Sequence, residues 1–341
     1  MSEKSGFSAV AATGIGSMPG GDAREAAKTV TGSFADGQGM PYLAELPARG
    51  PGADMIGRTV GLLVEMYGHV EPSGWRVSDR PGRDTRRARS WLGEDLDALE
   101  EFTQGYEGLL KVQSVGPWTL AAALEQRGGE AMLADPGACR DLAGSLAEGL
   151  RSHLAEVRRR VPGAEVVLQL DEPSLTAVLR GRIRSASGYR TYRAVDRQIV
   201  EGALRDVLAV NGGGPTAVHS CAPEVPFALL RRAGAGAVSF DFSLLTEREE
   251  EAIGEAVEGG THLFLGVVPG VDAASTALSD PGGSVMGVRT LWSRLGLNPG
   301  TLGESVVITP ACGLAGASPA YARAALAHCA RAARSLADNP E

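Results

Sequence analysis

The chain alternates short apolar runs with longer segments in which apolar residues recur at helical spacing. Short apolar runs are typical of buried strands, and the longer pattern is typical of amphipathic helices. Eight runs predict strands: Ala9–Thr13, Met40–Leu46, Leu109–Ser114, Val166–Asp171, Thr216–His219, Ala237–Asp241, His262–Val267 and Val306–Thr309. Helices are predicted between them, as in Asp141–Val157, Val195–Val210, Glu247–Val257 and 319–336. The pattern therefore predicts a parallel (β/α)8 TIM barrel, an α/β fold.

Two segments are longer than a minimal barrel requires. Residues from about 49 to 97 form an insertion or a long connection after the second predicted strand. Arg180–Arg193 follows the fourth strand, is rich in Gly, Ser, Tyr and Arg, and is a candidate cover for the barrel mouth. No stretch has the composition of an interdomain linker, and no repeat of 20–50 residues is present. We therefore expect one barrel domain over residues 1–341.

Composition and charge narrow the range of partners. The chain has 341 residues, of which 43% are hydrophobic, and a net charge of −8, which argues against nucleic acid or an anionic membrane as partner. No stretch approaches the roughly 18 apolar residues of a membrane span, and the N-terminus lacks the pattern of a signal peptide. Four cysteines do not make a disulfide framework in a chain of this length. The expected location is the cytoplasm.

Polar side chains follow or end most of the predicted strands. They are Ser17, Glu45, Asp171, Glu172, His219, Cys221, Asp241 and Cys312. Any one of them is explained by an ordinary turn. Because the carboxyl ends of barrel strands converge on one rim, where barrel active sites are built, we expect the set to lie together. Two cysteines and a histidine in that set favour a functional site.

His219, Cys221 and Cys312 are candidate metal ligands. The outer residues of His219-Ser220-Cys221 point to the same side of an extended backbone, and Cys312 follows the last apolar run. Thiolate and imidazole bind zinc, and a catalytic zinc keeps one exchangeable position. Asp241, which ends a run between them, fits either a fourth ligand or a carboxylate that orients His219. The alternative is that both cysteines are small buried hydrophobes.

Two further motifs predict contacts with a substrate. Asp171 ends the fourth strand and is a candidate partner for an ammonium group, whereas Glu172 precedes Pro173 and is expected beside a helix start. The glycine-rich turn over residues 13–21 exposes backbone N–H groups that suit an anion. It superficially resembles a dinucleotide loop, with Asp36 about 20 residues beyond Gly16. Asp36 lies in a predicted turn rather than at a strand end, which disfavours that interpretation.

Taken in order, these motifs resemble the catalytic C-terminal barrel of cobalamin-independent methionine synthase, in the short form without an N-terminal barrel. The matching pieces are Ile15-Gly16-Ser17-Met18-Pro19, Asp54-Met55, Gly116-Pro117-Trp118-Thr119, Asp171-Glu172-Pro173, His219-Ser220-Cys221 and Pro310-Ala311-Cys312-Gly313-Leu314. The resemblance spans nearly the whole chain. It implies a zinc-dependent methyltransferase that converts homocysteine to methionine.

The resemblance also implies roles for individual residues. His219, Cys221 and Cys312 would bind zinc, Asp171 would bind the substrate amino group, and Ile15 and Ser17 would bind its carboxylate. Two positions depart from the family pattern. The family usually has Glu where this chain has Asp241, and its second acidic residue is missing from Arg49-Gly50-Pro51-Gly52. Glu45 is the expected substitute for that acid.

The methyl donor and the acceptor leave alternatives open. Full-length relatives use a polyglutamylated methyl-folate, whereas short relatives are thought to use methylcobalamin or a methylated corrinoid protein, which is favoured here. A zinc barrel methyltransferase acting on another thiol is a second interpretation. A non-catalytic barrel with a decayed metal site is a third, and a nicotinamide enzyme that uses the glycine-rich turn is a fourth.

Overall fold

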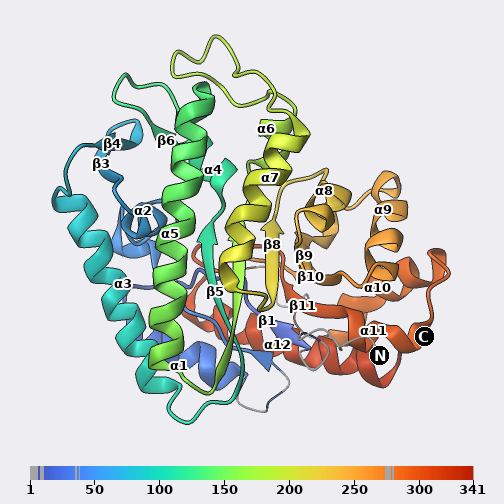
Figure 1. The fold of residues 1–341 in the computed structure, drawn as a ribbon. Helices are drawn as coiled ribbons and strands as arrows, with labels where there is room; N and C mark the ends of the chain where they lie inside the picture. Colours follow the sequence, from blue (N-terminus) through green and yellow to red (C-terminus); the bar gives the residue numbers. More distant parts are fainter. Residues whose placement is uncertain are drawn as a thin grey trace.

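The computed structural model describes residue 7 and residues 11–34, 37, 39–272, 278 and 280–340. In this part of the chain, eight strands form one sheet in the order β2-β1-β11-β10-β9-β8-β7-β5, and every pair is parallel. The strands are β1 (Ala12–Thr13), β2 (Gly39–Met40), β5 (Gly108–Val115), β7 (Ala164–Asp171), β8 (Thr216–Ser220), β9 (Ala237–Asp241), β10 (His262–Val268) and β11 (Val306–Pro310). A parallel bridge between Tyr42 and Lys111 brings β5 next to the chain after β2. The predicted TIM barrel is confirmed (Figure 1).

The observed strands match six of the eight predicted runs to within two residues at each end. Of the other two, the run Met40–Leu46 has only Met40 in a regular strand. Pro41 has no N–H to give to the ladder, which favours an irregular continuation. That continuation still follows the barrel wall, since Leu43 N donates to Lys111 O (3.0 Å). Part of the run Ala9–Thr13 and Asp36 lie outside the described residues.

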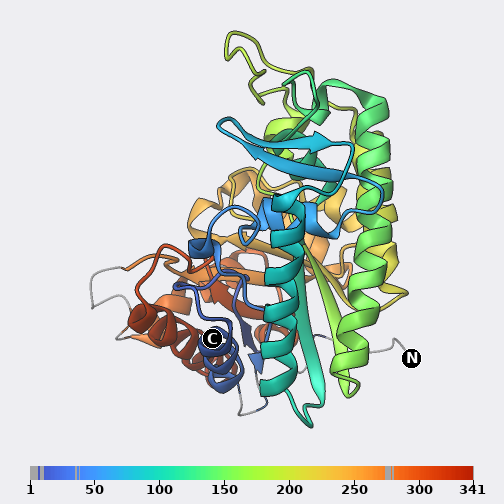
Figure 2. The same cartoon turned by 90° about the vertical axis from the view of Figure 1, so that its left-hand side faces the viewer.

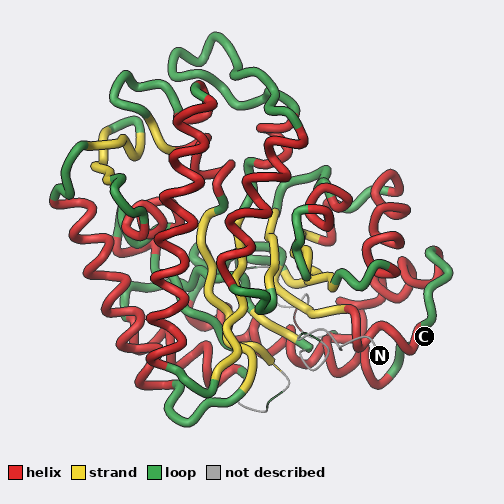
Figure 3. The backbone as a smooth tube through the Cα atoms, in the orientation of Figure 1, coloured by secondary structure: helices red, strands yellow, loops and turns green. Residues whose placement is uncertain are grey.

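Helices surround the sheet, as Figure 3 shows by the red tube around the yellow strands. They are α1 (Ala23–Ser33), α3 (Arg83–Phe102), α4 (Pro117–Ala123), α5 (Pro136–Arg160), α6 (Leu175–Leu179), α7 (Arg197–Leu208), α8 (Phe227–Arg232), α9 (Glu247–Glu258), α10 (Pro281–Arg294), α11 (Leu302–Ser305) and α12 (Pro319–Asp338). The four helices predicted by periodicity correspond to α5, α7, α9 and α12. Several begin at a side chain that accepts backbone N–H groups, such as Asp22, Asp135 and Ser318. None of the helices in the described part of the chain has the length and apolar character that a membrane crossing requires.

The long segment after β2 has its own structure. It contains α2 (Met55–Leu62) and an antiparallel hairpin of β3 (Tyr67–Glu71) and β4 (Gly74–Ser78), and β4 also pairs with β6 (Leu124–Glu125). Figure 2 shows the hairpin near the top, at the end toward which the barrel strands point. The end of the predicted insertion, near residue 97, lies inside α3 rather than at its start.

Arg180–Arg193 also lies at the carboxyl-terminal end of the barrel (Figure 1). Its first residue, Arg180, forms a 2.6 Å ion pair with Glu224, which follows Cys221 by three residues. Near the other end of the segment, the Tyr192 hydroxyl donates to the Glu130 carboxylate. This segment therefore contacts the loop that follows the His-Ser-Cys motif.

The barrel interior changes from apolar to polar along the strands. An apolar cluster fills its amino-terminal half: Phe7, Met40, Leu109, Val167, Ala217, Ala237, Phe264 and Val307. Since residues two apart on a strand face the same side, the next interior positions on β5 and β7 are Lys111, Gln113, Gln169 and Asp171. The corresponding positions on β8 and β9 are His219 and Ser239. All six are buried, so the apolar cluster supports a layer of polar side chains at the carboxyl-terminal rim.

Candidate metal centre

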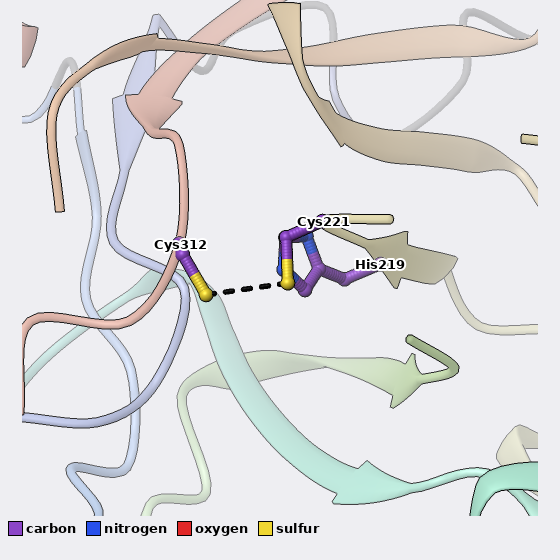
Figure 4. Close-up of side chains that lie close together, drawn as sticks. All are labelled: His219, Cys221 and Cys312. Carbon is purple, nitrogen blue, oxygen red and sulfur yellow. Dashed lines mark hydrogen bonds between the residues drawn. The ribbon is translucent and has the colours of Figure 1, made fainter. Parts of the chain in front are cut away.

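His219, Cys221 and Cys312 lie together at the rim. Each offers one ligand atom, and these atoms all lie within 4.8 Å of one another. The two sulfur atoms are 3.3 Å apart. Figure 4 shows them facing each other, with the imidazole beside Cys221. His219 is buried and Cys312 is exposed, so the group is open to solvent on the side of Cys312.

Two glycines allow the chain around Cys312 to come close to its neighbours. A Cβ on Gly266 of β10 would lie 2.5 Å from the Cα of Ala311, so a side chain there would displace the segment that carries Cys312. A Cβ on Gly313 would collide with the Ser17 hydroxyl. Leu314 N also donates to Ser17 O (2.9 Å). The turn after Cys312 is thereby packed against the glycine-rich turn that follows β1.

The two nitrogens of the His219 imidazole differ in their contacts. Nδ1 lies 2.9 Å from the Ser239 hydroxyl, in a buried position on β9. Nε2 is buried and has no hydrogen-bond partner among the described residues. When Nδ1 carries the proton and donates to Ser239, the Nε2 lone pair is free to bind a metal. A buried nitrogen without a partner is costly, and a metal ion would remove that cost.

The two thiols differ in acidity because they share a hydrogen bond. The bond with Cys221, followed by the interaction with His219, lowers the pKa of Cys312. The same bond raises the pKa of Cys221. The arrangement therefore favours the thiolate on Cys312, which is the form of cysteine that binds metals. The donor set of two sulfurs and one imidazole suits a borderline-soft ion.

Asp241 does not join this group. Its Oδ1 accepts from Ser243 N (2.9 Å) and Ser243 Oγ (2.7 Å), which caps the short 3-10 helix Phe242–Leu244. Among the described residues, the group whose ligand atoms gather consists of His219, Cys221 and Cys312. The structure thus brings together three of the four predicted ligands.

The predicted amino-group ligand, Asp171, lies next to the metal group. It is buried at the end of β7, where its register partner on β8 is His219. Its Oδ1 accepts from Gln169 Nε2 at 2.7 Å. Burial raises the pKa of Asp171, and the nearby His219 and Lys111 oppose that shift. A buried carboxylate of this kind favours a cationic partner.

Glu45, Ile15 and Ser17 come together beside Asp171. Glu45 forms a parallel bridge with Ser17, and its carboxylate accepts from Gln113 Nε2 at 3.2 Å. Burial raises the pKa of Glu45 to about 7, against the opposing effect of Arg58. The carbonyl of Ile15 accepts from Lys111 Nζ at 2.6 Å. The glycine-rich turn is therefore anchored to β5 while Ser17 remains partly exposed.

Glu172 has a structural role that differs from the prediction. It accepts from Trp118 N and Thr119 N (2.8 Å each) and from Thr119 Oγ1 (2.7 Å). Glu172 therefore accepts from the N–H groups at the start of α4. It does not serve the helix that follows it in the chain, α6, which begins only at Leu175. The Gly-Pro-Trp-Thr and Asp-Glu-Pro motifs are thus joined by one buried carboxylate.

Sequence reasoning missed Lys111, Gln113 and Gln169. All three are buried in strands that otherwise read as apolar. Lysine is rarely buried completely unless it is paired, so Lys111 within Leu109–Val115 was a usable signal. The pKa of Lys111 is lowered to about 8 by burial, although Asp171 and Glu45 oppose the shift.

Glu45 should give the metal-free protein a characteristic pH dependence. Its pKa is raised from 4.5 to about 7 by burial, so the folded protein holds a proton that the unfolded chain has lost between those values. Stability should therefore fall as pH rises through this range, by about 1.4 kcal/mol per pH unit from this residue. Glu45→Gln should flatten that slope and be more stable than the parent above pH 7. Urea unfolding of both proteins from pH 4.5 to 8 measures the difference, and parallel curves would contradict the assignment.

The fold and the rim group define a TIM-barrel protein with a histidine–dicysteine centre. The chain belongs to the cobalamin-independent methionine synthase family, because residues 10–335 match the protein-family model described as "Cobalamin-independent synthase, Catalytic domain". Family membership supports a methyltransferase activity.

One solved structure agrees with this chain on the fold. A B12-independent methionine synthase from Shewanella sp. W3-18-1, in complex with selenomethionine, matches with a TM-score of 0.57 at 14% identity, over 95% of this chain and 97% of that one. A β-mannanase from the blue mussel Mytilus edulis matches over 81% of this chain and 97% of its own at 9% identity, but its TM-score of 0.28 is too low to support an argument. A search of curated protein sequences found no match.

Proposed function

We propose that the protein is a zinc-dependent methyltransferase that transfers a methyl group to the sulfur of homocysteine and so forms methionine. The observation that carries the proposal is the His219–Cys221–Cys312 group beside the buried Asp171. Membership of the methionine synthase family supports it. The structural neighbour is in complex with selenomethionine, the selenium analogue of methionine, and this also supports a methionine-like amino acid as ligand.

The residues at the rim fit a zinc ion. His219 offers an Nε2 that has no hydrogen-bond partner among the described residues, and the bond between the two sulfurs favours the thiolate of Cys312. Bound zinc would supply a Lewis acid that keeps a substrate thiol deprotonated at neutral pH. Asp241, the fourth predicted ligand, uses its Oδ1 to accept from Ser243 and lies outside the group of three whose ligand atoms gather. In this proposal it is an alternative to the substrate sulfur at the fourth position.

The surrounding side chains would orient the amino acid. Asp171 and Glu45 would hold its ammonium group, while Ile15 and Ser17 of the glycine-rich turn would hold its carboxylate. With both ends fixed, the sulfur is directed toward the group formed by the two cysteines and the histidine. The new sulfur–carbon bond forms as the bond between the methyl group and its donor breaks. Such fixed alignment is worth a large part of the barrier in a group transfer.

Methyl transfer can be measured directly with the reduced, zinc-loaded protein. We expect methionine from homocysteine with methylcobalamin as donor, in preference to methyl-folate in its mono- and triglutamate forms. Mass spectrometry of the amino-acid product provides the readout. Faster methylation of other thiols, such as 2-mercaptoethanol, would favour the alternative acceptor class. No product with any donor would contradict the proposal and favour a binding barrel.

Ser239 should matter to the zinc ion although it does not reach the ligand position. Ser239→Ala removes the hydroxyl that fixes the ring of His219 at 2.9 Å. Loss of such a partner typically weakens metal binding by about 10- to 100-fold. Competition with a chelator measures the zinc affinity. Thr216→Val, at the opposite end of β8 from His219, is the matched control and should bind zinc like the parent; an unchanged affinity in Ser239→Ala would refute the role.

A further inference from the structure

Two buried glutamines lie side by side on the interior face of the barrel wall. Gln113 on β5 and Gln169 on β7 are partners in the register of these neighbouring strands. Both are at most 2% exposed. They lie two residues beyond Lys111 and Val167, on the interior side of their strands. A buried primary amide must satisfy two donors and an acceptor, so its partners show what the position is built for.

Each glutamine ties a carboxylate to a backbone carbonyl. Gln169 Nε2 donates to Asp171 Oδ1 (2.7 Å) and to Ile15 O (3.0 Å). Gln113 Nε2 donates to Glu45 Oε1 (3.2 Å) and to Leu43 O (2.7 Å). Because each Nε2 faces two acceptors, these contacts fix which end of the amide is nitrogen. The two amides therefore hold the carboxylates of Asp171 and Glu45 in fixed positions.

The oxygen atoms of the same two amides differ from the nitrogens in their contacts. Gln113 Oε1 and Gln169 Oε1 are both buried without a hydrogen-bond partner among the described residues. Leaving a buried acceptor without a donor is unfavourable. Two such acceptors on register partners, beside two carboxylates, form a region rich in acceptors.

Neither cation near these acceptors is hydrogen-bonded to a glutamine oxygen among the described residues. Lys111 Nζ donates to Ile15 O (2.6 Å) and lies 5.0 Å from the centre of the Tyr42 ring. Arg58, which acts on Glu45, donates through Nη1 to Asp95 (2.6 Å) and to Ala44 O (3.2 Å), whereas its Nη2 is buried without a partner in the described part of the chain. Both amide oxygens therefore remain open to a group with several N–H donors. An amino acid's ammonium group, with three donors, has that chemistry.

We propose that Gln113 and Gln169 are positioning residues of an ammonium subsite, holding Glu45 and Asp171 and offering their amide oxygens to the α-ammonium group of the substrate. This inference rests on the proposed function and extends it. It makes the site selective for thiols and thioethers that carry an α-amino group. The carbonyl of Ile15 keeps its bond to Lys111 when Gln169 is replaced, so the variants retain an anchor for the glycine-rich turn.

Binding of two ligands that differ only in the ammonium group tests this role without methyl transfer. The ligands are L-methionine and 4-(methylthio)butanoate, titrated by calorimetry into the zinc-loaded protein. The parent should prefer L-methionine. Gln113→Met and Gln169→Met keep the chain length but remove the amide, and each should weaken binding of L-methionine by roughly 10- to 100-fold. Binding of 4-(methylthio)butanoate should stay within about twofold. Gln→Leu at each position is a second pair, used if a Met variant fails to fold.

The control and the outcomes separate this inference from the proposed function. Thr216→Val removes a buried hydroxyl at the amino-terminal end of β8 and should keep the parent's preference. If the parent prefers L-methionine but the glutamine variants keep that preference, or lose both ligands equally, the ammonium role is overturned. If the parent itself binds L-methionine no better than 4-(methylthio)butanoate, the amino-acid site fails, and the inference fails with it.

Discussion

Replacing Cys312 with alanine should remove bound zinc from the protein, from about one ion per chain to almost none, and abolish methyl transfer. Cys312 supplies one of three ligand atoms that lie within 4.8 Å of one another. The variant would leave one imidazole and one thiol, and that thiol loses the hydrogen bond that the sulfurs share at 3.3 Å. We expect zinc affinity to fall by more than about 100-fold, beyond the loss typical of a supporting residue.

Metal analysis of the reduced protein, before and after dialysis against a chelator, measures this effect. Cys139→Ala is the matched control, because Cys139 lies in α5 and its sulfur contacts the carbonyl of Met132 at 3.4 Å. The control should bind zinc as the parent does. Retention of stoichiometric zinc by Cys312→Ala would mean that the ion is held elsewhere.

Asp95→Ala should destabilise the fold by about 3–5 kcal/mol. The Asp95 carboxylate accepts from Arg49 Nη2 (2.6 and 2.8 Å) and from Arg58 Nη1 (2.6 Å). The side chains of Arg49 and Arg58 are only 8% and 4% exposed. Removing the acid would therefore leave the buried Arg58 without its ion-pair partner, and it would leave Arg49 with the exposed Glu94 at 3.7 Å. Arg58 also lowers the pKa of Glu45, so the removal of Asp95 should affect a carboxyl group at the rim of the barrel.

Urea unfolding of the metal-free protein measures this loss. Glu101→Ala is the comparison, because it breaks an ion pair with Arg24 whose side chains are 68% and 45% exposed. Exposed pairs contribute about 0–1 kcal/mol, so this variant should unfold nearly as the parent does. Equal stabilities of Asp95→Ala and Glu101→Ala would show that the buried network does not stabilise the fold.

The barrel was predictable because its strands are buried on both faces and so appear as short apolar runs. Two of the predicted runs, Val166–Asp171 and Ala237–Asp241, show how closely this works, since they end where β7 and β9 end. The run Met40–Leu46 was predicted as a strand because periodicity does not register the missing N–H of Pro41. The hairpin β3–β4 was not predicted, and its further pairing with β6 joins residues more than 40 positions apart, which periodicity along the chain does not reveal.

The rim group was partly predictable for the same reason. His219, Cys221 and Cys312 follow strand ends, and parallel strands in a barrel bring their ends together. The side chain of Asp241 could not be placed from the run that it ends, because Ser243, two residues later, competes for its carboxylate. The roles of Gln113 and Gln169 depend on pairing between strands, which a single sequence does not show.

X-ray absorption at the zinc edge, with and without homocysteine, reports whether the substrate thiol binds the metal. We expect zinc in the resting protein to be bound by two sulfurs and one imidazole nitrogen, with a lighter atom completing the shell. Adding homocysteine should raise the number of bound sulfurs by one. An unchanged shell in the presence of saturating homocysteine would contradict activation of the substrate thiol at the His219–Cys221–Cys312 group.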